Sequence, residues 1–312
     1  MDKFEQIHQS DKLNMVTGVL SYTGKYITKR LLAMNERVRT LTSHPDRENP
    51  FGQEIEFFPY NFDKPQKLRE SLEGIETLFN TYWIRTPYAN MTFEKAVANT
   101  KILVEAAQMA GVKKIVHISV TNANVKSELP YFRGKGEVER IIQESGLNYV
   151  ILQPALIFGR EDILINNIAW CLRNFPIFGQ FGSGDYLVQP IYVDDLAEFA
   201  IQARDKEEDK VVNVAGPDTY TFDQLVHLIK SKVRSNSKIL HPPPFIPLIF
   251  AKIISQFVQD VLLTKDEMKG LMENLLYAET GLKGETQFST WLEENKEFLG
   301  IQYASELKRH YL

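Results

Sequence analysis

The sequence predicts an α/β protein built on a doubly wound parallel sheet, with a smaller, mainly helical C-terminal lobe. Short apolar runs alternate with longer amphipathic helical patterns through the first half of the 312-residue chain, as in βαβ units. A glycine-containing turn joins the first apolar run to the first helical pattern. The last third carries three helix-capping patterns, at residues 221–224, 264–267 and 290–293.

Apolar runs bounded by turn residues place the strands of the first half. We expect strands at residues 13–17, 37–42, 55–58, 77–80, 113–119 and 149–152. Helical patterns are expected at residues 23–34, from about 92 to 111, and at 131–145. Gly111 and Gly146 close the second and third of these patterns, because glycine readily adopts the conformation that ends a helix.

The pattern changes after Pro154. Residues 160–185 carry two Phe-Gly steps, a Gly-Ser-Gly and a proline, which favour an excursion from the sheet over another βα unit. Residues 187–192 and 211–214 indicate two further sheet strands around a helix that begins near Asp194.

These patterns divide the chain into two parts. We expect residues 1–159, completed by 186–216, to form the main domain. Residues 160–185 and 217–312 are expected to form the smaller lobe, which would bind a small-molecule substrate.

The composition is that of an ordinary globular protein and argues against several functional classes. Hydrophobic residues make up 44% of the chain and charged residues 24%. The net charge of −4 argues against a nucleic-acid partner, because phosphate binding needs a basic face. The single cysteine, Cys171, excludes an internal disulfide, and the six scattered histidines predict no metal site.

Neither a signal peptide nor a membrane span is expected. The first twelve residues are polar and mixed in charge, without the apolar core of a signal peptide. The most apolar window, 245–263, is interrupted by Lys252, Gln256, Gln259 and Asp260, which predicts an amphipathic helix that lines a groove. Contact of this helix with a membrane surface is the alternative. We expect a cytoplasmic protein.

The turn after the first strand, VTGVLSYTGKYI, predicts a dinucleotide site of the Rossmann type. Gly18 would supply the tight turn, and Gly24 would let the helix pack closely on the strand. Ser21 occupies the middle glycine position of a G-x-x-G-x-x-G pattern, and its hydroxyl could contact a phosphate. A plain strand–turn–helix connection is the alternative.

The end of the second strand favours NADP over NAD, with NAD as the alternative cofactor. An acidic residue at this point would bind the ribose hydroxyls of NAD. The chain instead has Thr42, Ser43 and His44, followed by Arg47, which could fork onto a 2′-phosphate. Asp46 lies past the turn proline, where it is poorly placed for the ribose. A solvated loop with one arginine is the alternative.

Three residues near the expected carboxyl edge of the sheet form a candidate catalytic set. Tyr131 and Lys135 are four apart and share one face of a helix, and Ser119 ends the preceding strand. A nearby ammonium would lower the high pKa of the tyrosine, and the serine would polarise the substrate oxygen. Thr121 is the alternative to Ser119. A structural tyrosine beside a surface lysine is the other interpretation.

Several motifs together resemble the short-chain dehydrogenase/reductase superfamily, on its extended and atypical side. They are TGVLSYTG, HISVTNA, PYFRGK, GLNYVILQPALIFG, QPIYVDDLAEFAI and VVNVAGPDTYTFDQLVHLI, and they cover about residues 13 to 230. Among its subgroups, the chain is most similar to NmrA-like proteins and to the nucleotide-binding accessory subunit of respiratory complex I.

The resemblance implies cofactor roles for particular positions. Matches to the pyrophosphate turn are Gly18, Ser21, Tyr22, Thr23 and Gly24. Matches to the adenine-contacting and nicotinamide-ribose segments are Asn61, Phe62, Asn80, Thr81 and Tyr82. Lys135 would contact the ribose as well as assist Tyr131. The segment beside the nicotinamide is matched by Pro154, Ala155 and Ile157.

The chain departs from the family pattern at the sites that recognise nucleotide sugars. Family members with such substrates commonly show Arg-Pro and then Tyr-Gly-Pro after the sixth strand. This chain has Gln153-Pro154 and Phe158-Gly159-Arg160. The departure argues against a nucleotide-sugar substrate.

Two other groups of residues invite a functional interpretation. Asp194 and Asp195 precede an apolar helix, where acidic residues stabilise the N-terminal end of the helix dipole. An apolar substrate cavity could be lined by aromatic residues that are otherwise expected in the core, namely Trp83, Trp170, Phe175, Phe178 and Phe181.

The leading functional hypothesis is an NADP(H)-dependent oxidoreductase that acts on a carbonyl or alcohol of a small molecule. Tyr131 would exchange the proton, Lys135 would tune its pKa and Ser119 would polarise the oxygen. The alternatives are a dinucleotide-binding sensor or scaffold without turnover, and a nucleotide-sugar epimerase or dehydratase. A homodimer is possible by analogy with the superfamily.

Overall fold

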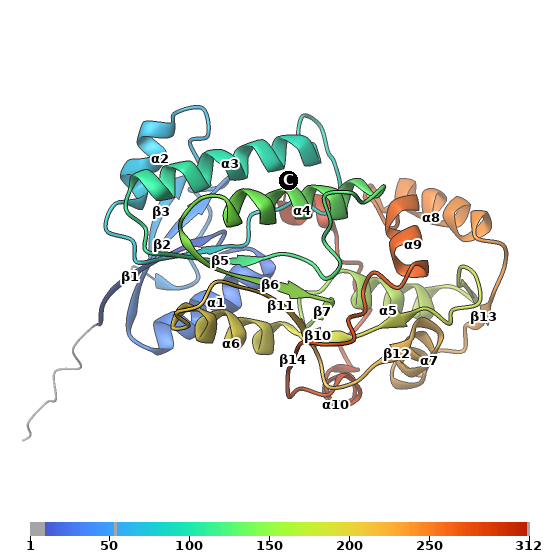
Figure 1. Ribbon diagram of the computed structural model, residues 1–312. Coiled ribbons are helices and arrows are strands. Elements are labelled where there is room, and N and C mark those ends of the chain that lie inside the picture. Colours follow the sequence, from blue (N-terminus) through green and yellow to red (C-terminus); the bar gives the residue numbers. More distant parts are fainter. Residues whose placement is uncertain (1–9, 53–54, 311–312) are drawn as a thin grey trace, which may run out of the picture.

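The computed structural model describes residues 10–52 and 55–310. Its centre is a parallel sheet in the order β14-β11-β6-β5-β4-β1-β2-β3 (Figure 1). The strands, in that order, are Leu282–Lys283, Lys210–Ala215, Asn148–Pro154, Lys114–Ile118, Thr77–Asn80, Ser10–Thr17, Glu36–Thr42 and Ile55–Pro59. The predicted α/β fold with a doubly wound sheet is therefore confirmed.

Helices cover both faces of the sheet, and each face has its own apolar core (Figure 1). One layer holds α2 (Pro65–Leu72), α3 (Phe93–Met109) and α4 (Pro130–Gln143). The other holds α1 (Tyr22–Ala33) and α6 (Val193–Arg204). Strands buried on both faces explain why the central sheet reads as short, continuous apolar runs.

A helical lobe lies beyond the carboxyl edge of the sheet. Its helices are α5 (Leu164–Asn174), α7 (Phe222–Lys232), α8 (Phe245–Val258), α9 (Lys265–Met272), α10 (Phe288–Asn295) and α11 (Glu306–His310). Three small two-stranded sheets join it: β7 (Leu156–Phe158) with β10 (Pro190–Tyr192), β9 (Leu187–Val188) with β12 (Tyr220–Thr221), and β8 (Ile177–Gly179) with β13 (Lys238–Leu240).

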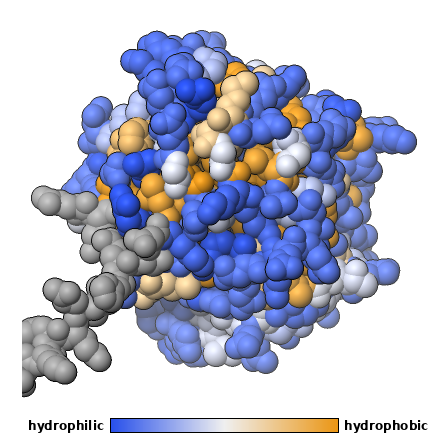
Figure 2. Space-filling view, turned by 60° about the vertical axis from the view of Figure 1, so that its left-hand side comes forward, coloured by the Kyte–Doolittle hydropathy of each residue, from blue (hydrophilic) through white to orange (hydrophobic). Residues whose placement is uncertain are grey.

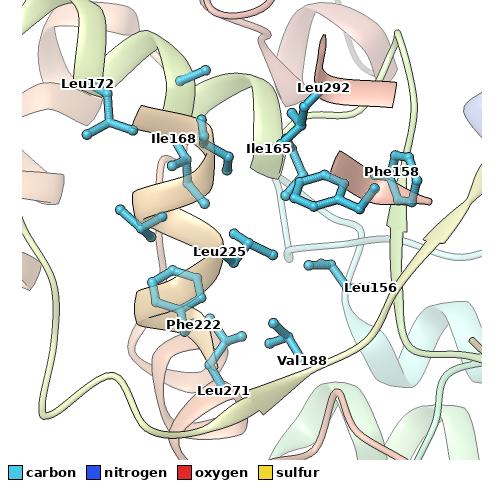
Figure 3. Packing of buried hydrophobic residues seen from close by; sticks show 14 of the residues in the cluster. Leu156, Phe158, Ile165, Ile168, Leu172, Val188, Phe222, Leu225, Leu271 and Leu292 are labelled. Carbon is cyan, nitrogen blue, oxygen red and sulfur yellow. The ribbon is translucent and has the colours of Figure 1, made fainter. Parts of the chain in front are cut away.

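The lobe has a separate hydrophobic core between α5, α7 and the strands that face them (Figure 3). Phe181 is buried there and stacks on Tyr186 and Phe222. Trp170 packs edge-on against Phe175. Of the aromatic residues considered for a substrate cavity, those in the lobe therefore pack with other residues of the lobe.

Several expectations for the later elements were wrong. Residues 187–192 do not form a strand of the main sheet, because they split into β9 and β10, which pair with lobe strands. The main sheet instead gains β14 from the C-terminal third. The capping boxes at Thr221 and Thr264 are confirmed, but α10 begins at Phe288, so Thr290 lies inside that helix.

Helix α8 exposes apolar side chains instead of lining a groove. It buries Pro247 and Ala251, but its other apolar residues fall around the helix and cannot all face the lobe. The large exposed side chains on it are Phe245, Ile249, Phe250, Ile253 and Phe257. No helix in the described residues combines the length and the apolarity that crossing a membrane requires.

Two acidic residues in the first turn of α6 form hydrogen bonds with residues outside that helix. The Asp194 carboxylate accepts a hydrogen bond from the Arg30 Nε of α1 at 2.9 Å. The Asp195 carboxylate accepts from the main-chain N–H and the hydroxyl of Thr286, at 2.8 and 2.9 Å. Both carboxylates lie in the first turn of α6, as predicted, and they also bind residues of α1 and of the loop before α10.

Candidate coenzyme cleft and catalytic residues

The glycine-containing turn between β1 and α1 is tightly closed. Gly18 has a φ of +71°, and its N–H donates to the Leu41 carbonyl at 2.8 Å. A Cβ added at Gly24 would lie 2.2 Å from the Gly18 carbonyl oxygen, so no side chain fits there. Gly24 is therefore required by the turn itself, which brings the start of α1 close to the end of β1.

Ser21 is the N-cap residue of α1. Its Oγ accepts a hydrogen bond from the Gly24 N–H at 3.3 Å. A hydroxyl that accepts one bond keeps its own hydrogen as a donor, and the free N–H groups of a helix start attract anions. These residues fit a pyrophosphate group.

A cleft of about 160 Å³ opens at this turn. Eight of the predicted cofactor residues line it: Gly18, Ser21, Thr42, Ser43, His44, Arg47, Thr81 and Tyr82. Asp46 is not among the described residues that line the cleft. The cleft is also lined by Thr17, Leu20, Tyr60, Trp83, Ile84, Met91 and Glu306, which the sequence analysis did not assign to the cofactor.

The remaining predicted cofactor residues are not part of the cleft lining. These are Tyr22, Thr23, Gly24, Asn61, Phe62, Asn80, Lys135, Pro154, Ala155 and Ile157. The first three form the start of α1 behind the turn. After β3, Tyr60 lines the cleft, whereas Asn61 and Phe62 do not. Phe62 stacks on Tyr60, with ring centroids 5.0 Å apart.

Asn80 has a structural role at the end of β4. Its Oδ1 accepts from the Tyr82 N–H at 3.1 Å, and its Nδ2 lies 3.1 Å from Nδ1 of the buried His117. Thr81 next to it donates its N–H to the Thr17 hydroxyl at 2.7 Å. These bonds hold the ends of β1, β4 and β5 together at the base of the cleft.

Lys135 is buried beneath the indole ring of Trp83. Its ammonium donates to the Ile118 carbonyl at 2.9 Å and lies 5.0 Å from the Trp83 ring centroid. Gly134 permits this packing, because a Cβ there would lie 2.8 Å from the indole. Burial lowers the pKa of Lys135 to about 7, although the Glu139 carboxylate opposes this shift.

Tyr131 lies among aromatic rings and a charged cluster. Its ring contacts Trp83, Phe93 and Phe132, with centroids 6.1, 5.9 and 5.4 Å away. Burial raises the pKa of its hydroxyl, and the charges of Glu267 and Glu306 add to this shift. The expected lowering of the Tyr131 pKa by Lys135 is therefore wrong for this structure.

The third predicted catalytic residue, Ser119, forms a hydrogen bond with Glu139 and none with Tyr131 or Lys135 among the described residues. Its hydroxyl donates to the carboxylate of the buried Glu139, which also accepts from the Gln153 side-chain amide at 2.8 Å. The alternative residue Thr121 donates to the Asn213 side chain at 2.7 Å. Within the described part of the chain, no hydrogen bond joins Ser119, Tyr131 and Lys135.

Arg85, in the loop after β4, forms an ion pair with Glu267, and both charges act on Tyr131. Its Nε donates to the Glu267 carboxylate of α9 at 2.6 Å, and its Nη2 donates to the Leu262 carbonyl at 3.3 Å. The charge of Glu306 acts on Arg85 as well as on Tyr131. The lobe and its C-terminal end therefore place two carboxylates beside the tyrosine.

A larger, open hollow of about 510 Å³ lies between the loop after β5 and α9. It is lined by Asn122, Ala123, Asn124, Ser127, Glu128, Leu129, Lys269, Glu273 and Leu275. None of the predicted site residues lines it, so the dinucleotide turn and this hollow are distinct features.

Comparison with known proteins supports a nicotinamide coenzyme. A family model described as NAD(P)H-binding matches residues 18–162, from the first glycine of the turn to the segment after β7. Residues 18–162 are thus similar to an NAD(P)H-binding domain, and they contain strands β2 to β6 of the parallel sheet. The match supports a nicotinamide coenzyme for this domain.

One relative is the mitochondrial NADH dehydrogenase [ubiquinone] 1 alpha subcomplex subunit 9 of Arabidopsis thaliana. It is 23% identical over 231 residues, which cover 70% of this chain and 57% of that protein. The match to this relative thus spans little more than half of its length.

Solved structures of epimerases share the fold. A nucleoside-diphosphate-sugar epimerase from Staphylococcus aureus has a TM-score of 0.72 at 16% identity, covering 90% of this chain and 99% of that one. A UDP-glucose 4-epimerase with UDP-glucose from Thermotoga maritima has a TM-score of 0.65 at 20% identity, covering 92% and 98%. The NAD(P)H-binding domain and the helical lobe are thus arranged as in these proteins.

Proposed function

We propose that this protein binds NADPH in preference to NADH and reduces the carbonyl group of a small molecule, with Tyr131 as the proton donor. The observation that carries the proposal is the position of Tyr131 beside the coenzyme cleft, with Trp83 contacting its ring and also lining the cleft. Burial raises the pKa of Tyr131, which keeps the phenol protonated at neutral pH. A protonated phenol suits reduction, because it can donate a proton to the substrate oxygen.

The coenzyme preference rests on the residues at the end of β2. Thr42, Ser43, His44 and Arg47 line the cleft and provide hydroxyl, imidazole and guanidinium groups for a 2′-phosphate. The turn at Gly18 and the N-cap Ser21 would bind the pyrophosphate. A bound nicotinamide supplies the hydride that reduces the substrate carbon.

The remaining predicted catalytic residues would act from behind Tyr131. Lys135 would anchor the nicotinamide ribose after the Trp83 ring moves aside, because its ammonium already points toward that ring. The Ser119 hydroxyl donates a hydrogen bond to Glu139. It would have to break this bond and donate to the substrate oxygen in order to polarise it. Coenzyme binding is therefore expected to rearrange this part of the site.

The test compares Tyr131→Phe with the wild-type protein. Both are titrated with NADPH and then supplied with a panel of aldehydes and ketones, and oxidation of NADPH is followed by absorbance. We expect Tyr131→Phe to bind NADPH within about twofold of wild type while turnover falls by at least about a hundredfold. Retention of turnover by a variant without the phenol hydroxyl would refute the proposed proton donor.

A second function, coenzyme binding without turnover in a larger assembly, is favoured by the packing of Trp83. This ring contacts both Tyr131 and Lys135, and Ser119 is bonded to Glu139. The Arabidopsis relative is itself named as a subunit of an NADH dehydrogenase. Stoichiometric copurification of a partner protein, together with no NADPH oxidation by any carbonyl compound, would favour this function.

Nucleotide-sugar epimerisation or dehydration remains the third alternative. Gln153 of β6, which replaces the family arginine, donates a hydrogen bond from its side-chain amide to Glu139 of α4. An increase in the melting temperature of the protein with UDP-glucose, but not with glucose alone, would favour this alternative. The homodimer and the cytoplasmic location stay predictions.

A further inference from the structure

The C-terminal segment crosses from the lobe to the coenzyme cleft. After α10 the chain continues as residues 299–308, which we call the C-terminal strap. In Figure 1 this part of the chain rises from α10, at the bottom of the view, to the level of α4. Glu306, near its end, lines the same cleft as Gly18, Ser21 and Arg47.

Two buried asparagines of α5 fasten the first part of the strap. The Asn166 side chain donates to the Gln302 carbonyl at 2.8 Å and accepts from the Gly300 N–H at 3.0 Å. The Asn167 side chain donates to the Ala304 carbonyl at 3.0 Å and accepts from its N–H at 2.9 Å. A side-chain amide offers both a donor and an acceptor, so each asparagine fixes main-chain groups of both kinds.

A buried carboxylate fastens the end of the strap. Asp260, just after α8, accepts from the Glu306 N–H at 2.7 Å and from the Leu307 N–H at 3.3 Å. Leu307 is itself buried. Glu306 itself lines the cleft, and only 5% of the residue is exposed.

The negative charge of Glu306 in the strap opposes the binding of a dinucleotide. Arg85 pairs with Glu267 at 2.6 Å, and the charge of the Glu306 carboxylate also acts on Arg85. A dinucleotide carries a negatively charged pyrophosphate, and like charges in a cleft with little water repel strongly. The cleft volume of about 160 Å³ is also below the roughly 300–1,000 Å³ that is usual for ligand sites.

We propose that the C-terminal strap is autoinhibitory: Glu306 occupies the coenzyme cleft, and the strap must leave it for NAD(P)H to bind. The coenzyme and the strap then compete for one cleft, so any interaction that draws residues 299–308 away raises coenzyme affinity. This proposal rests on the assignment of the cleft to the coenzyme.

The first test measures the dissociation constant for NADPH in two charge-removing variants. Glu306→Gln keeps the shape of the side chain, and Glu297→Gln is the matched control on an exposed residue just before the strap. We expect Glu306→Gln to lower the Kd by about tenfold, because a repulsive contact is removed. The control should change it by less than about twofold. An unchanged or higher Kd for Glu306→Gln would overturn the proposal.

The second test follows the strap in the wild-type protein by amide hydrogen exchange. With saturating NADPH, the main-chain amides of Gly300, Ala304 and Glu306 should exchange faster, because displacement breaks their bonds to Asn166, Asn167 and Asp260. Slower exchange would mean that the strap closes over the coenzyme, contrary to the proposal. A protein that binds NADPH but shows no such change would refute the strap alone, whereas absence of binding in wild type and both variants would refute the coenzyme cleft.

Discussion

The ammonium nitrogen of Lys135 lies 5.0 Å from the centroid of the Trp83 indole ring. The same indole contacts Tyr131 and lines the coenzyme cleft. Its Nε1 is buried without a hydrogen-bond partner among the described residues, so the ring can move without breaking a hydrogen bond. Trp83 thus connects the cleft to the two candidate catalytic residues on α4.

Coenzyme binding should be reported by Trp83 fluorescence. The ring lines the cleft, so NADPH should quench its emission in the wild-type protein. Trp83→Phe should lose most of this quenching. Trp170→Phe should retain it, because Trp170 packs on Phe175 and Tyr303 in the lobe. Equal quenching in both variants would contradict the placement of Trp83 beside the coenzyme.

Burial of Lys135 predicts a particular dependence of stability on pH. The pKa is lowered by burial from 10.5 to about 7 in the folded state. Between these values the unfolded chain holds a proton that the folded protein lacks, so this residue makes folding more favourable as pH rises. Below about pH 7 both states are protonated, and the cost of burying the charge is fully present.

Lys135→Met removes this cost, and urea denaturation at several pH values measures the result. We expect the stability of the variant relative to wild type to be highest near pH 7 and to decline toward pH 10. Lys101→Met, on the exposed face of α3, is the control and should show no such trend. A difference in stability between Lys135→Met and wild type that stays constant with pH would show that folding does not lower the pKa of Lys135.

Gly24→Ala should disrupt the coenzyme turn. The added Cβ would lie 2.2 Å from the Gly18 carbonyl oxygen, a main-chain atom that cannot move without opening the turn. We expect a loss of about 1–3 kcal/mol in the free energy of unfolding, with loss of NADPH binding. Gly179→Ala is the control, since the nearest neighbour of its Cβ lies at an ordinary 3.5 Å. Normal NADPH binding by Gly24→Ala would refute this account of the turn.

Local sequence patterns predicted the sheet and the turn well. The run 77–80 matches β4 at both ends, and the first-strand prediction 13–17 lies within β1. The turn at Gly18 could be predicted because its requirement is local: a positive φ, followed by a close approach at Gly24. The fold of this domain could therefore be predicted from the sequence.

Features that depend on distant contacts could not be predicted in this way. β14 contributes only two residues to the main sheet, and its pairing with β11 joins positions far apart in the chain. Glu306 lines the cleft, and Asn166, Asn167 and Asp260 hold the strap in this position. No periodicity or motif near Glu306 indicates these contacts.

The catalytic set shows the same limit. The four-residue spacing correctly placed Tyr131 and Lys135 on α4, but it carried no information about Trp83. The bond from Ser119 to Glu139 likewise depends on packing between β5 and α4. Spacing predicted which residues come near the cleft, and packing determined which groups they contact.

The most direct test of the central claim is a titration of the purified protein with NADPH and with NADH, followed by nicotinamide fluorescence. We predict saturable binding of both, with NADPH tighter, and Arg47→Ala should weaken NADPH by about tenfold while leaving NADH unchanged. Arg140→Ala, on an exposed position of α4, should behave as wild type. Failure of the folded wild-type protein and of Glu306→Gln to bind either dinucleotide would contradict the claim that the Gly18 turn is a coenzyme site.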